Sequence, residues 1–173
     1  MTTIDISQEN TEEVGELIEQ KVLETDQSEV VFGDIPDRFN YLELVVEATN
    51  TGTDDGNTIL PVFNGDSDRN NYEAYRIRWD SDAQADVRED GEIGFIQSTD
   101  REAYPLSVSI EGYSNPDMMT TYISEFVQTN VPRANILGSA WDDKSVVTEL
   151  KLERSSEDNS IASGSTFTLI GVE

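Results

Sequence analysis

Several short segments of the chain alternate between apolar and polar residues. In Tyr41–Ala48, the apolar residues Leu42, Leu44 and Val46 occupy every second position. A period of two is typical of a β-strand with one face against a core. Further strands are predicted over Ile59–Phe63, Tyr72–Trp79, Glu92–Ser98, Tyr104–Tyr113, Thr120–Gln128, Asn135–Trp141, Val146–Arg154 and Thr166–Val172. Turn residues separate these segments about every ten residues, which predicts an all-β sandwich or barrel.

Two of the predicted strands differ in how cleanly their residues alternate. In Tyr72–Trp79, the residues Tyr75, Ile77 and Trp79 share one face, which we expect to point into the core. Thr120–Gln128 alternates less cleanly, which is consistent with a strand that is buried on both faces.

Arginines occupy the opposite face of the Tyr72–Trp79 strand. Arg76 and Arg78 lie there, and together with the nearby Arg69 they form the only local cationic cluster of the chain. Two interpretations remain open. The arginines could pair with the abundant acids of neighbouring strands, which contributes little per exposed pair. Alternatively, Arg76 and Arg78 could contact another subunit through bidentate bonds to its carboxylates.

The N-terminal segment has a different periodicity. One apolar stripe, at positions i, i+3, i+4 and i+8 of Thr11–Thr25, is typical of an amphipathic helix. The stripe consists of Val14, Leu17, Ile18 and Val22. Thr11 is a suitable N-cap for this helix. We therefore divide the chain into residues 1–28, with a short α-helix, and a β-sandwich domain of residues 29–173. The helix packs on its own domain, or it serves in docking or oligomerisation.

The dipeptide Asn64-Gly65 predicts a hairpin turn, because both residues tolerate positive φ angles. Asp66 and Asp68 follow it at alternate positions, as at the start of a calcium-binding loop. The rest of such a loop is missing, since Tyr75 stands where the loop requires glutamate. We favour a turn in which Asx side chains bond their own backbone, and Asp66 and Asp68 are only weak metal candidates. No cofactor is predicted.

Acidic residues dominate the charge of the 173-residue chain. Asp and Glu number 36 against 11 Lys and Arg, for a formal net charge of -25, and the acids are spread along the chain. Such a surface repels itself at low ionic strength, whereas molar salt reduces the screening length to about 3 Å. This composition favours a halophilic source. Nucleic acid is not expected as a partner, because its binding requires a basic surface.

Two residue types are missing from the sequence. It contains no cysteine and no histidine, which excludes disulfides, thiolate chemistry and imidazole-dependent nucleophilic sites. Two carboxylates alone could support glycoside hydrolysis, but in a chain with so many acids a carboxylate pair has no specificity. We therefore predict that the protein is not an enzyme. No signal peptide and no apolar run of about 18 residues is apparent, so membrane insertion is not expected.

Three motifs resemble those of virion structural proteins of tailed viruses. The first spans Val31–Leu44, and the second is Phe-Asn-Gly-Asp-Ser followed by Asn-Tyr within Phe63–Tyr72. The third, Gly-Ser-Thr-Phe-x-Leu-x-Gly-Val, covers Gly164–Val172, where Ile170 replaces the usual tyrosine. In this order the motifs frame residues 30–173. The resemblance implies a jelly-roll-like antiparallel sandwich and a structural role.

Proteins of the resembled kind lie on the particle exterior as oligomers, with trimers favoured. With the acidic composition, the resemblance leads us to expect a capsid decoration or turret protein of a haloarchaeal tailed virus, made in the host cytoplasm. Its expected partners are further copies of the chain and the major capsid protein or other virion proteins. The alternative is a tail-fibre or baseplate module that binds glycans of the host surface.

Overall fold

The computed structural model describes residues 15–52, 58–79, 84–88, 92–95, 97–98, 105–128, 133–155 and 158–173. These residues form antiparallel sheets packed as a sandwich, and the only helix among them is the short 3-10 helix η1 (Arg69–Asn71). The prediction of an all-β sandwich is confirmed.

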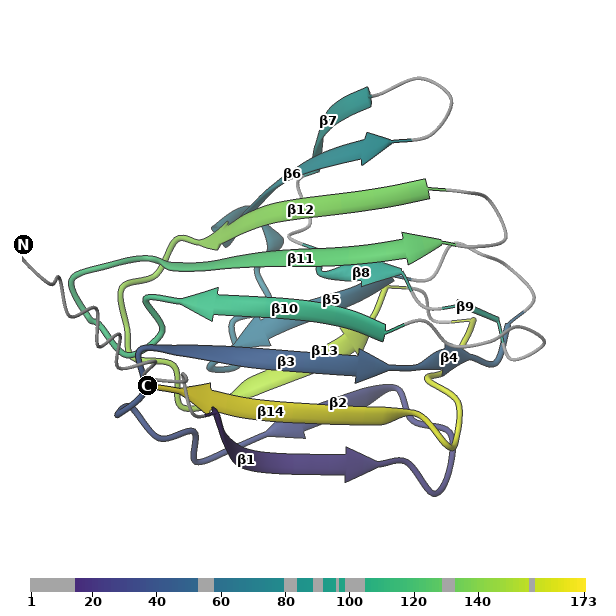
Figure 1. Ribbon diagram of the computed structural model, residues 1–173, viewed down its shortest axis with the longest axis horizontal. Coiled ribbons are helices and arrows are strands. Elements are labelled where there is room, and N and C mark those ends of the chain that lie inside the picture. Colours follow the sequence, from purple (N-terminus) through teal and green to yellow (C-terminus); the bar gives the residue numbers. More distant parts are fainter. Residues whose placement is uncertain are drawn as a thin grey trace, which may run out of the picture.

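Two sheets make up the sandwich, and a two-stranded parallel pair of β4 (Thr49–Asn50) and β9 (Gln97–Ser98) accompanies them. The larger sheet has the order β1 (Gly15–Val22), β14 (Thr166–Val172), β3 (Tyr41–Glu47), β10 (Pro105–Glu111), β11 (Thr120–Gln128), β12 (Arg133–Trp141), β6 (Tyr72–Trp79) and β7 (Gln84–Arg88). The smaller sheet has the order β2 (Glu29–Phe32), β13 (Leu150–Arg154), β5 (Thr58–Phe63) and β8 (Gly94–Phe95). In Figure 1 the larger sheet lies in front, from β1 at the bottom to β7 at the top.

Eight of these strands follow the order of a jelly roll, a double-sheet architecture. Numbered along the chain, β1, β2, β3, β5, β8, β10, β13 and β14 form sheets of order 1-8-3-6 and 2-7-4-5. The other four strands of the larger sheet continue it beyond β10. We call β11, β12, β6 and β7 the extension. It consists of two inserted hairpins: β6–β7 lies between β5 and β8 in the chain, and β11–β12 lies between β10 and β13.

The core lies between the two sheets and has the predicted alternation. The larger sheet contributes the buried residues Leu42, Leu44, Val46, Leu106, Val108, Ile110, Phe167 and Leu169. The smaller sheet contributes Val30, Phe32, Ile59, Phe63, Leu150 and Leu152. Burying one such side chain fully is worth about 1.5–3 kcal/mol, so the jelly roll provides most of the hydrophobic stabilisation.

The predicted N-terminal helix is wrong for the residues that the structure describes. Residues 15–22 form strand β1, which pairs with β14 at the edge of the larger sheet and so belongs to the sandwich. The register shifts between Leu17 and Glu19, which leaves Ile18 as the extra residue of a β-bulge. The bulge interrupts the alternation, so the apolar residues acquire a spacing that imitates the period of a helix.

The Asn64-Gly65 turn forms, but it does not close a hairpin. Asn64 and Gly65 have φ angles of 50° and 76°, and the Asp66 N–H donates to the Phe63 carbonyl at 2.9 Å. The strand before the turn, β5, belongs to the smaller sheet, whereas β6 belongs to the larger one. The turn therefore carries the chain from one sheet to the other.

Candidate functional site

Strand β6 presents Tyr75 and Ile77 to solvent and Arg76 to the interior. Tyr75 is 60% exposed and Ile77 is 44% exposed, whereas Arg76 is only 4% exposed. The expectation that Tyr75 and Ile77 face the core is therefore wrong, as is the expectation that Arg76 is available to another subunit. Trp79 and Arg78 lie outside the part of the chain whose side chains the structure describes.

Contacts at the start of β6 explain this orientation. The Tyr72 hydroxyl donates to the Asp66 carbonyl at 2.8 Å and accepts from the Phe63 N–H at 3.0 Å. The Tyr72 ring stacks on Trp141 and Phe63, with centroids 6.5 and 6.3 Å apart. Burial raises the pKa of the Tyr72 hydroxyl to about 12. Since side chains alternate along a strand, an inward Tyr72 sends every odd-numbered position outward, including Tyr75.

The neighbouring strands add apolar residues to the same outer face. Gly138 of β12 pairs with Tyr75 of β6 on one side and with Ile123 of β11 on the other, and in the next row Ile136 faces Ile77. Ile123 is 51% exposed, so the prediction that its strand is buried on both faces is wrong.

These residues surround a hollow of about 470 Å³ that we call the apolar furrow. Its lining consists of Glu73, Tyr75, Ile77, Thr121, Ile123, Ile136, Gly138, Ser139 and Ala140. Across Ile123 it continues into a smaller, polar hollow of about 280 Å³ lined also by Ser107, Ser109, Glu111 and Glu125. The face therefore has an apolar centre, with glutamates and hydroxyl groups at its margin.

The inner face of the extension is unusually polar. Arg76 Nη1 lies 3.6 Å from Glu92 Oε1, and both side chains are almost fully buried. Four further polar residues are buried here on β11 and β12: Thr120, Ser124, Asn135 and Ser139. A side-chain atom of each of the first three has no hydrogen-bond partner among the described residues. Buried polar atoms without partners reduce stability. The extension thus buries polar groups beside apolar ones such as Phe126 and Leu137, and it exposes apolar residues on its outer face. Such a conflict with folding rules is expected at functional sites.

The apolar residues of the predicted N-terminal helix lie at the β1 edge of the larger sheet, opposite β7. Leu17 and Val22 are exposed on β1, whereas Ile18 is partly buried against the core. Val14 lies outside the described residues. β1 and β7 are the two edge strands of this sheet, so these side chains and the apolar furrow form separate surfaces.

Asp66 and Asp68 stabilise the turn between the sheets. Trp141 Nε1 and Asn71 Nδ2 donate to Asp66 Oδ2 at 2.8 and 2.9 Å. Burial raises the pKa of Asp66, but these hydrogen bonds outweigh it and hold the pKa below its usual value. Asp68 Oδ1 accepts from the Asn70 N–H, as expected for an Asx turn. No cluster of three or more acidic side chains suited to a metal ion occurs among the described residues.

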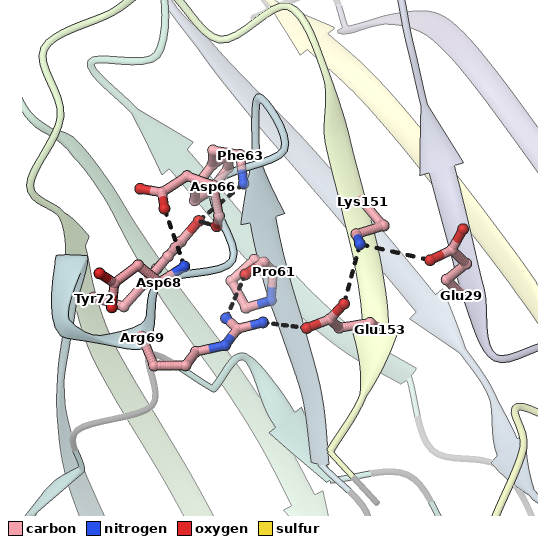
Figure 2. Close-up of polar contacts among 9 residues, drawn as sticks. All are labelled: Glu29, Pro61, Phe63, Asp66, Asp68, Arg69, Tyr72, Lys151 and Glu153. Atoms are coloured by element: carbon pink, nitrogen blue, oxygen red, sulfur yellow. Dashed lines mark hydrogen bonds and ion pairs between the residues drawn. The ribbon is translucent and has the colours of Figure 1, made fainter. Parts of the chain in front are cut away.

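Arg69, the third member of the predicted cationic cluster, forms its polar contacts with other residues of the sandwich (Figure 2). Its guanidinium donates to the Pro61 carbonyl at 2.9 Å and pairs with the Glu153 carboxylate. Lys151 lies between Glu153 and Glu29, with Nζ 3.2 and 3.6 Å from their oxygens. The network links η1 to β5, β13 and β2, so its role is structural.

Comparisons with known proteins do not assign this chain to a group. No family model, no curated protein and no solved structure matches it. Within the described ranges, no helix is long and apolar enough to cross a membrane. The furrow and the sequence motifs are therefore the features of the chain that bear on its function.

Proposed function

We propose that this chain is a non-catalytic structural protein of a virus particle, and that it assembles with another protein surface through the outer face of the extension. The observation that carries the proposal is the exposure of Tyr75, Ile77 and Ile123 together over a buried Arg76. A contiguous exposed apolar patch in an otherwise charged protein typically marks an interaction site. An apolar centre with a polar margin is also the usual anatomy of a protein interface.

The location on a virion is supported by the order of the three sequence motifs. Jelly rolls also occur in viral capsid proteins. Within the particle we favour a capsid decoration or turret protein on the exterior, in contact with further copies of itself and with the major capsid protein. The net charge of -25 supports a virus of a halophilic host.

Localisation on intact particles tests this proposal directly. Gold-labelled antibodies against the chain should decorate the heads of particles purified in molar salt. A particle preparation without label would contradict the proposal. Particles that carry Tyr75→Ser should retain less of the protein, because the variant removes apolar contact area from the furrow. Leu17→Ser is the matched control: Leu17 is 59% exposed but lies on β1, at the opposite edge of the sheet.

A second candidate is an adhesion module of the tail that binds host glycans. The observation in its favour is the exposed Tyr75 ring, which lies on the furrow together with Glu73 and Thr121. An aromatic face beside a carboxylate and a hydroxyl suits a sugar ring, and lectins also use jelly rolls. This function predicts label on tails. It also predicts that host-surface glycans change the NMR signals of the furrow residues and that Tyr75→Ala abolishes the change.

A further inference from the structure

The apolar furrow has a shape that suits a copy of itself. Tyr75 projects from β6, and its pairing partner Gly138 on β12 leaves a gap in the same row of the sheet. A Cβ atom added to Gly138 would meet no heavy atom of the described residues within 4 Å beyond its chain neighbours. A protruding ring and an open position therefore lie about 5 Å apart, on adjacent strands of one surface.

We propose that a second copy of this chain occupies the furrow, packed face to face about a two-fold axis that runs between β6 and β12. A two-fold contact requires that each residue pair be made twice, once in each direction. About this axis, Tyr75 of each copy enters the gap over Gly138 of the other. The same rotation places Ile77 of one copy over Ile136 of its partner, because these residues are also paired across β6 and β12.

The size of the extension limits the strength of this contact. The four strands are 5 to 9 residues long. Spaced about 4.8 Å apart and with a mean length of roughly 26 Å, they cover about 500 Å² per copy. Two copies would bury about 1,000 Å² in total, the lower limit for a specific interface. The dimer should therefore be weak and depend on protein concentration.

The charge of the two surfaces determines whether added salt strengthens or weakens the dimer. Glu73 and Glu125 lie at the margin of the furrow, and each copy carries a net charge of -25. Two copies repel each other in dilute salt, so the dimer should strengthen as salt rises to molar concentrations. A partner with a basic margin would bind in the opposite manner, more weakly as salt rises. The inference depends on the proposed role of the face in assembly and not on location in a virion.

Measurement of mass in solution tests the inference. The full chain in molar KCl should show the mass of two chains at high concentration and of one chain in dilute salt. Gly138→Ile fills the gap with a residue that β-strands favour. It should raise the dissociation constant of the dimer at least tenfold, and so should Tyr75→Ser. Leu17→Ser should leave it unchanged. Thermal unfolding of each variant separates lost association from lost folding, and Tyr75→Ser remains informative if Gly138→Ile fails to fold.

Cross-linking tests the two-fold geometry separately. The chain has no cysteine, so introduced thiols are the only ones present. A thiol-reactive bismaleimide about 10 Å long matches the spacing of two packed sheets. It should link an equimolar mixture of Tyr75→Cys and Gly138→Cys chains into a mixed dimer, whereas it should not link Leu17→Cys to Gly138→Cys. A single-chain mass at all concentrations in molar salt, a mass of three chains, or association that weakens with salt would overturn the inference. None of these results depends on where the protein lies in a particle.

Discussion

Replacing Arg76 by methionine should destabilise the sandwich strongly, because it leaves the Glu92 carboxylate in the interior without this cation. The two side chains are about 5% exposed, and Arg76 Nη1 lies 3.6 Å from Glu92 Oε1. With an effective dielectric constant of about 20, the Coulomb energy is about 332/(20 × 3.6), or roughly 4.6 kcal/mol. Removing one partner of a buried pair typically costs about 3–5 kcal/mol, which agrees with this value.

A double-mutant cycle measured by urea unfolding isolates the pair. Arg76→Met and Glu92→Leu should each lower the free energy of unfolding by about 3–5 kcal/mol. The double variant should lie much closer to the wild type, because two apolar side chains then replace two charges. Arg38 and Glu16 form an exposed pair with Nη2 2.7 Å from Oε1, so Arg38→Met is the matched control and should have a far smaller effect.

The cycle also tests the orientation of β6. If Arg76→Met and Glu92→Leu cost no more than the control and their effects add, the pair is not buried in solution. In that case Tyr75 and Ile77 would occupy the interior, and the apolar furrow would not exist.

Further predictions concern the turn between the sheets, a close glycine contact and the net charge. Asp66→Ala should lower the free energy of unfolding by about 2–3 kcal/mol, because the Trp141 N–H loses a charged acceptor, and tryptophan fluorescence in urea measures this. The pKa of Asp66 is lowered in the folded state, so its contribution to the free energy of unfolding is present above the unfolded-state pKa and is lost as pH falls through the folded-state pKa. Over that pH range, the wild type should lose more stability than Asp66→Ala. Gly171→Ala should cost about 1–3 kcal/mol, because its Cβ would enter the Phe39 ring, whereas Gly138→Ala should be tolerated. Dilution from molar to about 0.1 M KCl should lower the Tm, since the net charge of -25 becomes unscreened, and an unchanged melting curve would contradict this reasoning.

The strands of the jelly roll could be predicted because each has one face on the core and one in solvent. Leu42, Leu44 and Val46 show this in β3, where every second residue is buried. Such a difference between faces is visible in the sequence as a period of two. The bulge at Ile18 interrupts that period in β1, so the sequence of this strand has the apolar spacing of a helix.

The furrow could not be predicted from alternation alone, because β6 has apolar residues on both faces. Tyr72 and Ala74 compete with Tyr75 and Ile77 for the interior, and composition does not choose between them. The choice depends on contacts of Tyr72 with Trp141, which is far away in the chain. One signal was present in the sequence: strands β11 and β12 carry hydroxyl and amide residues at positions where core strands carry aliphatic ones.

The acidic surface and the apolar furrow are best understood together. An exposed apolar patch normally leads to nonspecific association. A net charge of -25 makes two chains repel each other, so only a contact that buries much apolar area is favourable. In molar salt the repulsion acts over only about 3 Å, so a contact that fits closely can form while a loose one gains little. Selectivity then comes from shape, which is the role we infer for Tyr75 and Gly138. The jelly roll supplies the stability that permits the inserted hairpins to expose apolar residues on one face and to bury polar groups among the apolar residues of the other.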